Sequence, residues 1–133
     1  MDGNTIAWKS TKQPQAPRST AEAECTAMAY ASQTLEGLAC LFHSMRVVIG
    51  LPTLYCDNRA AVHLSTGSNE WRTKALVNRI MGVRSLIQLG FLHLEFLPTA
   101  EMQADILVKY MGNKVLSRLR LLIGCVPPGR IAG

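Results

Sequence analysis

Three acidic residues, Glu24, Asp57 and Asp105, stand at positions where a carboxylate could do chemistry. Clustered carboxylates bind hard divalent cations such as Mg²⁺ or Mn²⁺, and two such cations can hold both the attacking and the leaving oxygen of a phosphodiester. Spacing alone leaves another interpretation open, because the chain has nine acidic residues and offers many such triplets. In that interpretation Glu24 is an acid near a helix terminus and Asp57 is the cap of the next helix.

The elements that must position these acids begin with a strand predicted over Thr5–Trp8 and a helix predicted over Thr20–Met45. Ser19 and Glu22 have the spacing of a capping box, which indicates where the helix starts. The apolar stripe of the helix repeats at helical spacing through Met28, Ala31, Leu35, Leu38, Phe42 and Met45. One further step back along this stripe reaches Glu24, a carboxylate that is costly to bury unless something pairs with it.

The remaining chain predicts alternating strands and helices. They are a strand over Thr53–Asp57, a helix over Asn58–Ser65, a loop over Thr66–Glu70, a helix over Thr73–Leu89, a strand over Phe91–Leu97, and helices over Ala100–Tyr110 and Lys114–Ile123. Gly90 should end the long helix, whose apolar stripe is Leu76, Ile80, Val83 and Ile87. This order predicts an α/β layer fold, in which sites gather at the carboxyl ends of parallel strands. Asp57 occupies one such end, and Asp105 lies in the later helix.

Several stretches carry a more specific signal: P-R-S-T-A-E-A-E (17–24), L-Y-C-D-N-R-A-A (54–61), W-R-T-K (71–74) and F-L-P-T-A-E-M-Q-A-D-I-L-V-K (96–109). In the same order and with similar gaps, they closely resemble the ribonuclease H domain of copia-type retrotransposon polyproteins. I-A-W-K-S-T-K-Q (6–13) and the terminal Leu116–Cys125 also resemble that family. The resemblance therefore covers essentially the whole chain.

The resemblance implies a ribonuclease H-like fold, in which helices flank a mixed sheet. It also implies that the domain cuts the RNA strand of an RNA–DNA hybrid during reverse transcription. It implies four acidic ligands for two Mg²⁺ or Mn²⁺ ions, of which the second, third and fourth match Glu24, Asp57 and Asp105. One ion would activate a water and the other would stabilise the 3′-oxygen leaving group. Four basic residues are candidate phosphate contacts, although each is equally well explained as a solvated surface charge: Arg18, Arg72, Lys74 and Lys109.

The sequence departs from the family in ways that bear on activity. The family's first acid and first two strands have no match here, so the resemblance is to a ribonuclease H-like domain truncated at its N-terminus. Thr53–Asp57 would then lack its partner strand, and we expect marginal stability unless an upstream segment of the polyprotein, carrying the reverse transcriptase, completes the sheet. We also expect little or no activity from this chain alone. Glu70 and Ala75 stand where the family usually has His, and Cys25 where it has Tyr.

Charge is unevenly distributed and favours a polyanionic partner. Residues 1–70 hold five Lys or Arg and six acids, for a net charge of −1. Residues 71–133 hold nine Lys or Arg and three acids, for a net charge of +6. A solvated basic surface explains this equally well on charge alone. Two other functions stay open: a non-catalytic remnant that binds nucleic acid through its basic half, and an unfolded or purely structural product of a dead reading frame.

Composition excludes several classes of protein. With 48% apolar and 17% charged residues, the chain should fold, and we expect one domain over residues 1–126 with a disordered tail over 127–133. The four cysteines form no C-x-x-C pair, so they are expected to be reduced and buried. No apolar stretch is long enough to cross a bilayer and Met1–Ser10 is not a secretory signal, so we expect an intracellular protein with no membrane partner.

Overall fold

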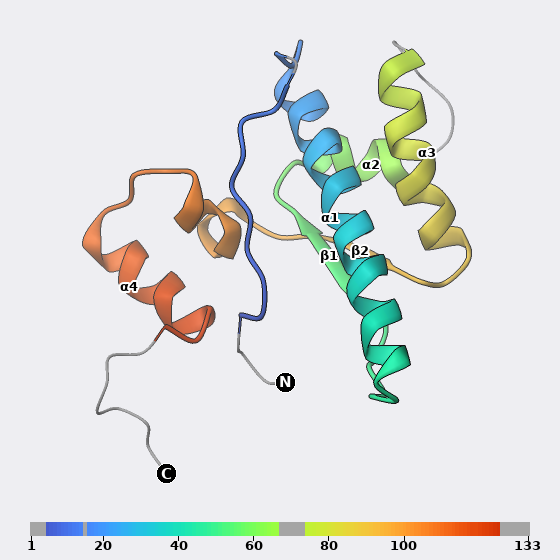
Figure 1. Ribbon diagram of the computed structural model, residues 1–133. Coiled ribbons are helices and arrows are strands. Elements are labelled where there is room, and N and C mark those ends of the chain that lie inside the picture. Colours follow the sequence, from blue (N-terminus) through green and yellow to red (C-terminus); the bar gives the residue numbers. More distant parts are fainter. Residues whose placement is uncertain (1–4, 15, 67–73, 126–133) are drawn as a thin grey trace. The chain divides into compact units, whose positions relative to one another are not determined.

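The computed structural model describes residues 5–14, 16–66 and 74–125, which hold four α-helices, two β-strands and two 3₁₀ helices (Figure 1). In chain order these are α1 (Thr20–Ser44), β1 (Thr53–Cys56), α2 (Arg59–Thr66), α3 (Lys74–Gln88), β2 (His93–Phe96), η1 (Thr99–Glu101), η2 (Gln103–Leu107) and α4 (Asn113–Leu122). The predicted α/β class is confirmed. The chain divides into two compact units, one of Gln15–Leu97 and one of Met1–Pro14 with Pro98–Gly133.

Helix α1 starts where the sequence predicts because Ser19 is its N-cap. The Ser19 backbone is extended, and its Oγ accepts a hydrogen bond from the Glu22 N–H at 3.1 Å. Glu22 Oε2 in turn accepts from the main-chain N–H of Arg18 at 2.8 Å, one residue before the donor of the usual capping box. The Glu22 carboxylate thus serves the start of the helix.

The predicted stripe of α1 faces the core over most of its length. Met28 is buried, and the next four stripe positions are half-buried: Ala31, Leu35, Leu38 and Phe42. Met45 is 60% exposed, so its predicted place in the core is wrong. The helix ends at Ser44 with Met45 as its C-cap, and Met45 lies among other exposed apolar residues, Val47 and Val48, rather than against the core.

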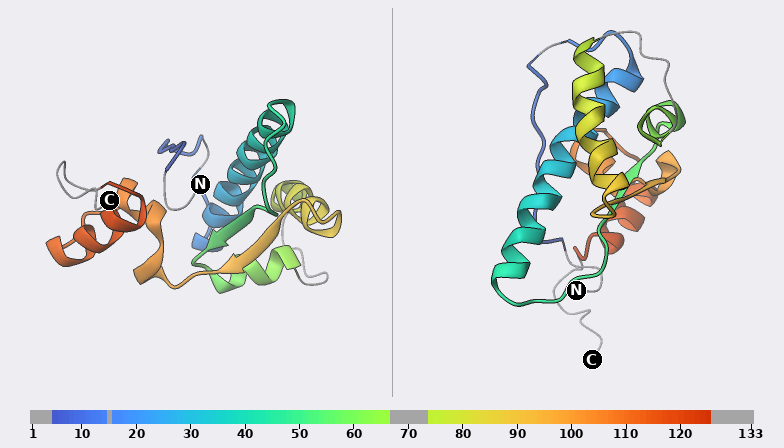
Figure 2. Two further views of the ribbon diagram at one scale, coloured as in Figure 1. Left: turned by 90° about the horizontal axis from the view of Figure 1, so that it is seen from below. Right: turned by 90° about the vertical axis from the view of Figure 1, so that its right-hand side faces the viewer.

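Strands β1 and β2 pair in parallel, with Thr53 opposite His93 and Cys56 opposite Phe96. One face of the pair carries buried side chains, while Tyr55 on the other face is exposed. Figure 2 shows the two strands side by side with α1 running past them, and α1 packs against β1. Because parallel strands end at the same edge, Asp57 lies at the carboxyl edge of this small sheet.

Helix α3 ends at the glycine that the sequence indicates. Gly90 has a φ of 72°, a conformation that residues with a Cβ rarely adopt. Its N–H donates to the Ile87 carbonyl at 3.0 Å, and the Phe91 N–H donates to the Leu86 carbonyl at 2.9 Å. These two bonds form a Schellman motif, which reverses the chain toward β2.

The core of the Gln15–Leu97 unit is formed by α1, α2, α3 and the two strands. The α3 stripe behaves as predicted, since Ile80 and Val83 are fully buried while Leu76 and Ile87 are half-buried. The buried cluster consists of Cys25, Met28, Leu54, Cys56, Ala61, Ile80, Val83, Leu92 and Leu94. Contacts among distant segments therefore hold this unit together.

Two arginines of α3 link it to neighbouring helices by hydrogen bonds. Arg79 Nη1 donates to Thr26 Oγ1 at 2.9 Å and so ties α3 to α1. Arg84 Nη2 donates to the Leu64 carbonyl at 2.9 Å, and Arg84 Nε donates to the Ser65 carbonyl at 3.4 Å. The last turn of α2 has no later turn to supply donors, so Arg84 satisfies carbonyl oxygens there.

The other unit holds the two elements that the sequence mispredicts. Thr5–Trp8 forms no strand, because the ladder in the described residues is confined to β1 and β2; instead Thr5 Oγ1 donates to the Ile123 carbonyl at 2.8 Å. The predicted helix over Ala100–Tyr110 is replaced by η1 and η2. Met102 separates them with an extended backbone (ψ 102°), which interrupts the α-helical hydrogen bonds. Helix α4 matches the helix predicted over Lys114–Ile123 to within one residue.

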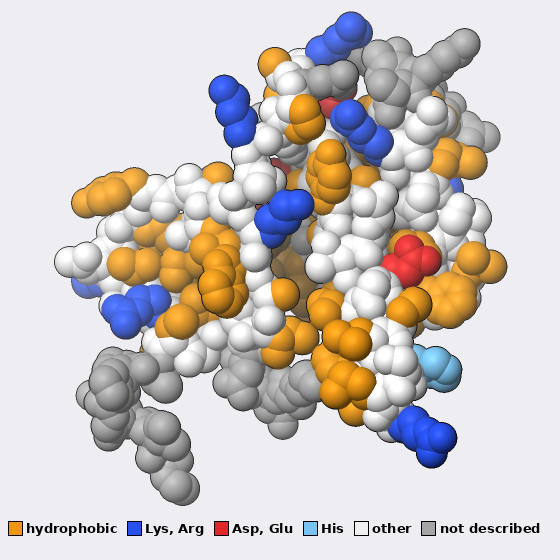
Figure 3. Space-filling model, in the orientation of Figure 1, with side chains coloured by type: hydrophobic (Ala, Val, Ile, Leu, Met, Phe, Trp, Pro, Cys, Tyr) orange, Lys and Arg blue, Asp and Glu red, His pale blue; other side chains and the backbone are white. Residues whose placement is uncertain are grey.

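Exposed apolar side chains surround the carboxyl end of α1 (Figure 3). They include Leu41, Met45, Val47 and Val48. No helix in the described part of the chain is long and apolar enough to cross a membrane. Residues 67–70 of the predicted loop and the predicted tail over 127–133 lie outside the described residues.

Candidate metal site

Glu24 lies in the second turn of α1 and is half-buried. Glu22 is engaged at the helix start, so the two acids of A-E-A-E have different surroundings. Cys25, the next residue along the helix, is fully buried in the core. The rotation of α1 that buries Cys25 keeps Glu24 beside the core rather than on the solvated side of the helix.

Asp57 follows β1 directly and is also half-buried. Helix α2 starts two residues later, and Asn58 Oδ1 accepts a hydrogen bond from the Ala61 N–H at 3.1 Å. Asn58 therefore supplies a side-chain cap to α2, the role that the alternative interpretation gave to Asp57. The position of Asp57 at the end of a buried strand is as the sequence predicts.

The carboxylates of Glu24 and Asp57 act on the same buried thiol. Burial is the largest cause of the raised pKa of Cys56; a hydrogen bond with the backbone of Asn58 opposes it, and the negative charges of Glu24 and Asp57 raise it further. Asp57 is the chain neighbour of Cys56, and the packing of α1 against β1 brings Glu24 near the same thiol. The pair is a long-range product of the fold.

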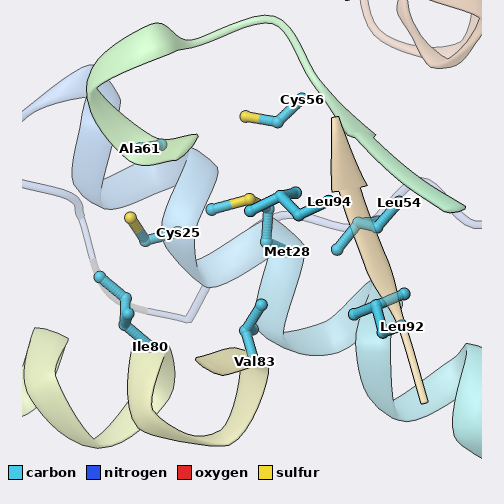
Figure 4. Packing of buried hydrophobic residues seen from close by; sticks show 9 residues of the cluster. All are labelled: Cys25, Met28, Leu54, Cys56, Ala61, Ile80, Val83, Leu92 and Leu94. Carbon is cyan, nitrogen blue, oxygen red and sulfur yellow. The ribbon is translucent and has the colours of Figure 1, made fainter. Parts of the chain in front are cut away.

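The pKa of Cys25, on the α1 side of the contact between α1 and β1, is raised by nearby negative charges as well. Figure 4 shows Cys25 on α1 and Cys56 on β1 in one buried cluster. Burial raises the pKa of Cys25 to about 11, and the charges of Cys56, Glu24 and Glu22 contribute to the rise. Negative potential therefore collects where the start of α1 meets the carboxyl end of β1.

The two carboxylates fit the chemistry of a hard divalent cation. Mg²⁺ is commonly held by one or two carboxylates together with waters and substrate phosphate oxygens, and Mn²⁺ takes similar ligands. Within the described residues, no group of three or more His, Cys, Asp or Glu side chains is arranged to hold a metal ion. Glu24 and Asp57 both lie near Cys56, and among the described residues they do not form a complete metal site.

Asp105 belongs to the other compact unit and lies in η2. Its side chain is 13% exposed and accepts a hydrogen bond at 2.8 Å from Lys109 Nζ, whose side chain is 52% exposed. Two predicted site residues, one a metal ligand and one a phosphate contact, are therefore an ion pair. The Asp105 carboxylate is mostly shielded from water, and it is bound to the Lys109 ammonium rather than placed beside another acid.

The structure describes the side chains of only some of the other predicted basic residues. Arg18 is exposed just before the N-cap of α1. Arg72 lies outside the described residues, and Lys74 begins α3 but its side chain is not among those described. The sequence reasoning missed Arg59, whose guanidinium carbon lies 4.1 Å from the centroid of the Phe96 ring. The available signal was an arginine and an aromatic residue near the carboxyl ends of two predicted strands.

Comparison with known proteins gives a distant relation to retrotransposon polyproteins. The chain is 29% identical over 127 residues to the Retrovirus-related Pol polyprotein from transposon RE2 of Arabidopsis thaliana. It is 28% identical over 127 residues to the Retrovirus-related Pol polyprotein from transposon RE1 of the same plant. Each match covers 92% of this chain and 9% of the relative, so the chain spans a small part of those polyproteins. No family model and no solved structure matches.

Proposed function

We propose that this chain is a ribonuclease H-like part of a retrotransposon Pol polyprotein, whose ancestral reaction is hydrolysis of RNA in RNA–DNA hybrids. The observation that carries the proposal is the position of Asp57 directly after β1, the strand against which α1, the helix of Glu24, packs. The distant similarity to Pol polyproteins over 92% of the chain supports it independently.

In this proposal Glu24 and Asp57 hold Mg²⁺ or Mn²⁺ through their carboxylate oxygens, and Asp105 is a further ligand that the resemblance implies. When bound, the two ions supply an activated water and stabilise the 3′-oxygen that leaves. The chain's own contribution is to fix the ligands. The buried contact of α1 with β1 positions Glu24 and Asp57, and the Asn58 cap starts α2 immediately after Asp57. Ordered elements hold ligands more accurately than loops do.

Phosphate groups of the hybrid are the proposed partners of the basic residues Arg18, Arg72, Lys74 and Lys109. The family's first acidic ligand, which has no match in this chain, would come from another segment of the polyprotein, which also carries the reverse transcriptase. We therefore expect little or no cleavage by this chain alone. A second candidate function, non-catalytic binding of nucleic acid, is favoured by the net charge of +5.

The first experiment measures metal binding directly. Mn²⁺ is titrated into the full chain and free Mn²⁺ is followed by electron paramagnetic resonance, for the wild type and for Glu24→Gln and Asp57→Asn. Each substitution should weaken binding by about tenfold or more, which corresponds to ~1.4 kcal/mol. Glu36→Gln is the matched control, because Glu36 is exposed on the same helix. Equal binding by all four proteins would overturn the metal site.

The second experiment follows the reaction. A labelled RNA–DNA hybrid is incubated with the chain and Mg²⁺ or Mn²⁺, beside Asp57→Asn and Asp105→Asn. If the wild-type chain cleaves the hybrid and both variants do not, the result would support the enzymatic function and contradict the inactivity that we expect. Binding of the hybrid without cleavage, unchanged in Asp57→Asn, would favour the non-catalytic function instead.

A further inference from the structure

Helix α2 and strand β2 frame an open cavity of about 390 Å³ in the Gln15–Leu97 unit. Its lining consists of Arg59, Val62, His63, Thr66 and Phe96. The four α2 residues follow the spacing of one helix face, so the helix presents them together. This volume lies in the range of about 300–1,000 Å³ that small-molecule sites occupy.

The cavity contains a stacked cation. The Arg59 guanidinium carbon lies 4.1 Å from the Phe96 ring centroid, a close cation–π contact. Stacking engages one face of the guanidinium, whereas its N–H donors lie in the plane and point outward at the edges. The second face and the edges of the Arg59 guanidinium can therefore contact a bound molecule. Phe96 is half-buried, which anchors this stack to the sheet.

Each lining group matches a part of a nucleotide. A guanidinium plane stacks on a base and its edge binds phosphate oxygens with charge assistance. Val62 adds an apolar wall, and the His63 imidazole adds a hydrogen-bonding group for a sugar or base edge. The Thr66 hydroxyl donates its proton to the Val62 carbonyl at 3.0 Å, so it can only accept a hydrogen bond from the ligand. Bases within a duplex already stack on one another, so only an unpaired base can stack on Arg59.

We propose that this cavity binds one unpaired nucleotide of single-stranded nucleic acid, with its base on the Arg59–Phe96 stack and its phosphate on the edge of the Arg59 guanidinium. The Gln15–Leu97 unit holds seven Lys or Arg and six acids, so its net charge is only +1, and Arg59 supplies the positive charge that meets the phosphate. The proposal goes beyond the metal site and does not depend on it, because none of the cavity residues is a candidate metal ligand.

The test is fluorescence anisotropy of a labelled single-stranded RNA of about ten nucleotides, within the usual site sizes of such proteins. EDTA is present, so failure of the metal site cannot affect the result. Arg59→Lys retains the charge but loses the planar stack, and Phe96→Leu retains apolar volume but loses the ring. Each should weaken binding about fivefold or more, because base stacking contributes ~1–3 kcal/mol.

The matched control is Lys114→Gln, which removes one exposed positive charge from α4 in the other unit. It should weaken binding less than Arg59→Lys does. Equal losses in the two variants would mean a diffuse electrostatic surface and would overturn the site. Circular dichroism melts establish that each variant is folded, and the exposed Arg59 gives a variant in which the core is unchanged.

Competition identifies the ligand class. An RNA–DNA hybrid of the same length should compete more weakly than the unlabelled single strand, and a poly-glutamate peptide more weakly still. Equal competition by the hybrid would contradict the requirement for an unpaired base. Equal competition by the peptide would show recognition of charge alone, which would also overturn the proposal. Quenching of 2-aminopurine in the probe, lost in Arg59→Lys, should report the stack directly.

Discussion

Asn58 Oδ1 accepts a hydrogen bond from the Ala61 N–H at 3.1 Å and so caps helix α2 at the edge where β1 ends. Asp57 lies between the strand and this cap and is half-buried. Ala61 is itself fully buried in the core cluster. One hydrogen bond thus couples the direction of α2 to the strand end that carries Asp57, and it also fixes the start of the helix that carries Arg59.

Replacing Asn58 by Ala should lower the free energy of unfolding by about 1 kcal/mol, the usual effect of losing a side-chain N-cap. Urea unfolding followed by circular dichroism measures the change. Asn78→Ala is the control, because Asn78 is an exposed residue within α3 and its loss should change stability by about 0.5 kcal/mol or less. Similar losses in both variants would show that the Asn58 bond does not stabilise α2.

Arg84 should stabilise the protein more than an exposed arginine does. Arg84→Met removes the donors to the Leu64 and Ser65 carbonyls, and we expect a loss of about 1–3 kcal/mol because those carbonyls lose a charged partner. Urea unfolding gives the total, and hydrogen exchange should show earlier opening of α2. Arg118→Met is the matched control, since Arg118 is 62% exposed and its ion pair with Glu101 is long, at 3.6 Å. A loss from Arg118→Met as large as that from Arg84→Met would contradict this assignment.

The sequence predicts the elements best where a boundary residue has a local physical role. Ser19 and Gly90 mark the start of α1 and the end of α3, because a side-chain oxygen and a positive φ act within one turn of the chain. Prediction fails for Thr5–Trp8, since a strand requires a partner that local pattern does not supply. The prediction of one helix over Ala100–Tyr110 also fails, because Met102 has an extended backbone that no residue pattern indicates.

The residues of the candidate site are also predicted by local features, whereas the contacts between them are not. The head of a core-facing stripe and the end of a strand are local features, and they identified Glu24 and Asp57 separately. Asp57 is next to Cys56 in the chain, whereas the approach of Glu24 to that thiol depends on which face of α1 packs against β1, a long-range choice that one sequence does not reveal. The contact of Arg59 with Phe96 is long-range for the same reason.

Stability should fall at alkaline pH because of the buried thiols. The folded protein raises the pKa of Cys25 from 9.0 to about 11, so it retains a proton that the unfolded chain releases first. Cys25 should therefore leave the unfolding free energy unaffected below about pH 8 and should lower it as the pH rises from 9.0 to about 11. Urea unfolding across this range, in reducing buffer, measures the slope.

Cys25→Ala should flatten that alkaline slope, although it will also lower stability at every pH by removing a buried side chain. Cys40→Ala removes an exposed thiol and should leave the slope unchanged. A slope that stays the same in Cys25→Ala would mean that other groups cause the alkaline loss. The raised pKa of Cys56 should leave a residual slope in this variant, with the same sign.

The chain should be marginally stable, and its core should tolerate little change. A two-stranded sheet depends on helix packing for its stability, and the side chains of Val48 and Trp8 are 96% and 74% exposed. We expect an unfolding free energy at or below ~5 kcal/mol, the low end for folded domains. Ile80→Ala, which removes about 2–5 kcal/mol from a fully buried site, should then leave much of the chain unfolded at 25 °C. Met81→Ala, at the neighbouring and 47% exposed position, should leave it folded. A cooperative urea transition in Ile80→Ala with several kcal/mol remaining would show that the chain is more stable than its exposed apolar surface indicates.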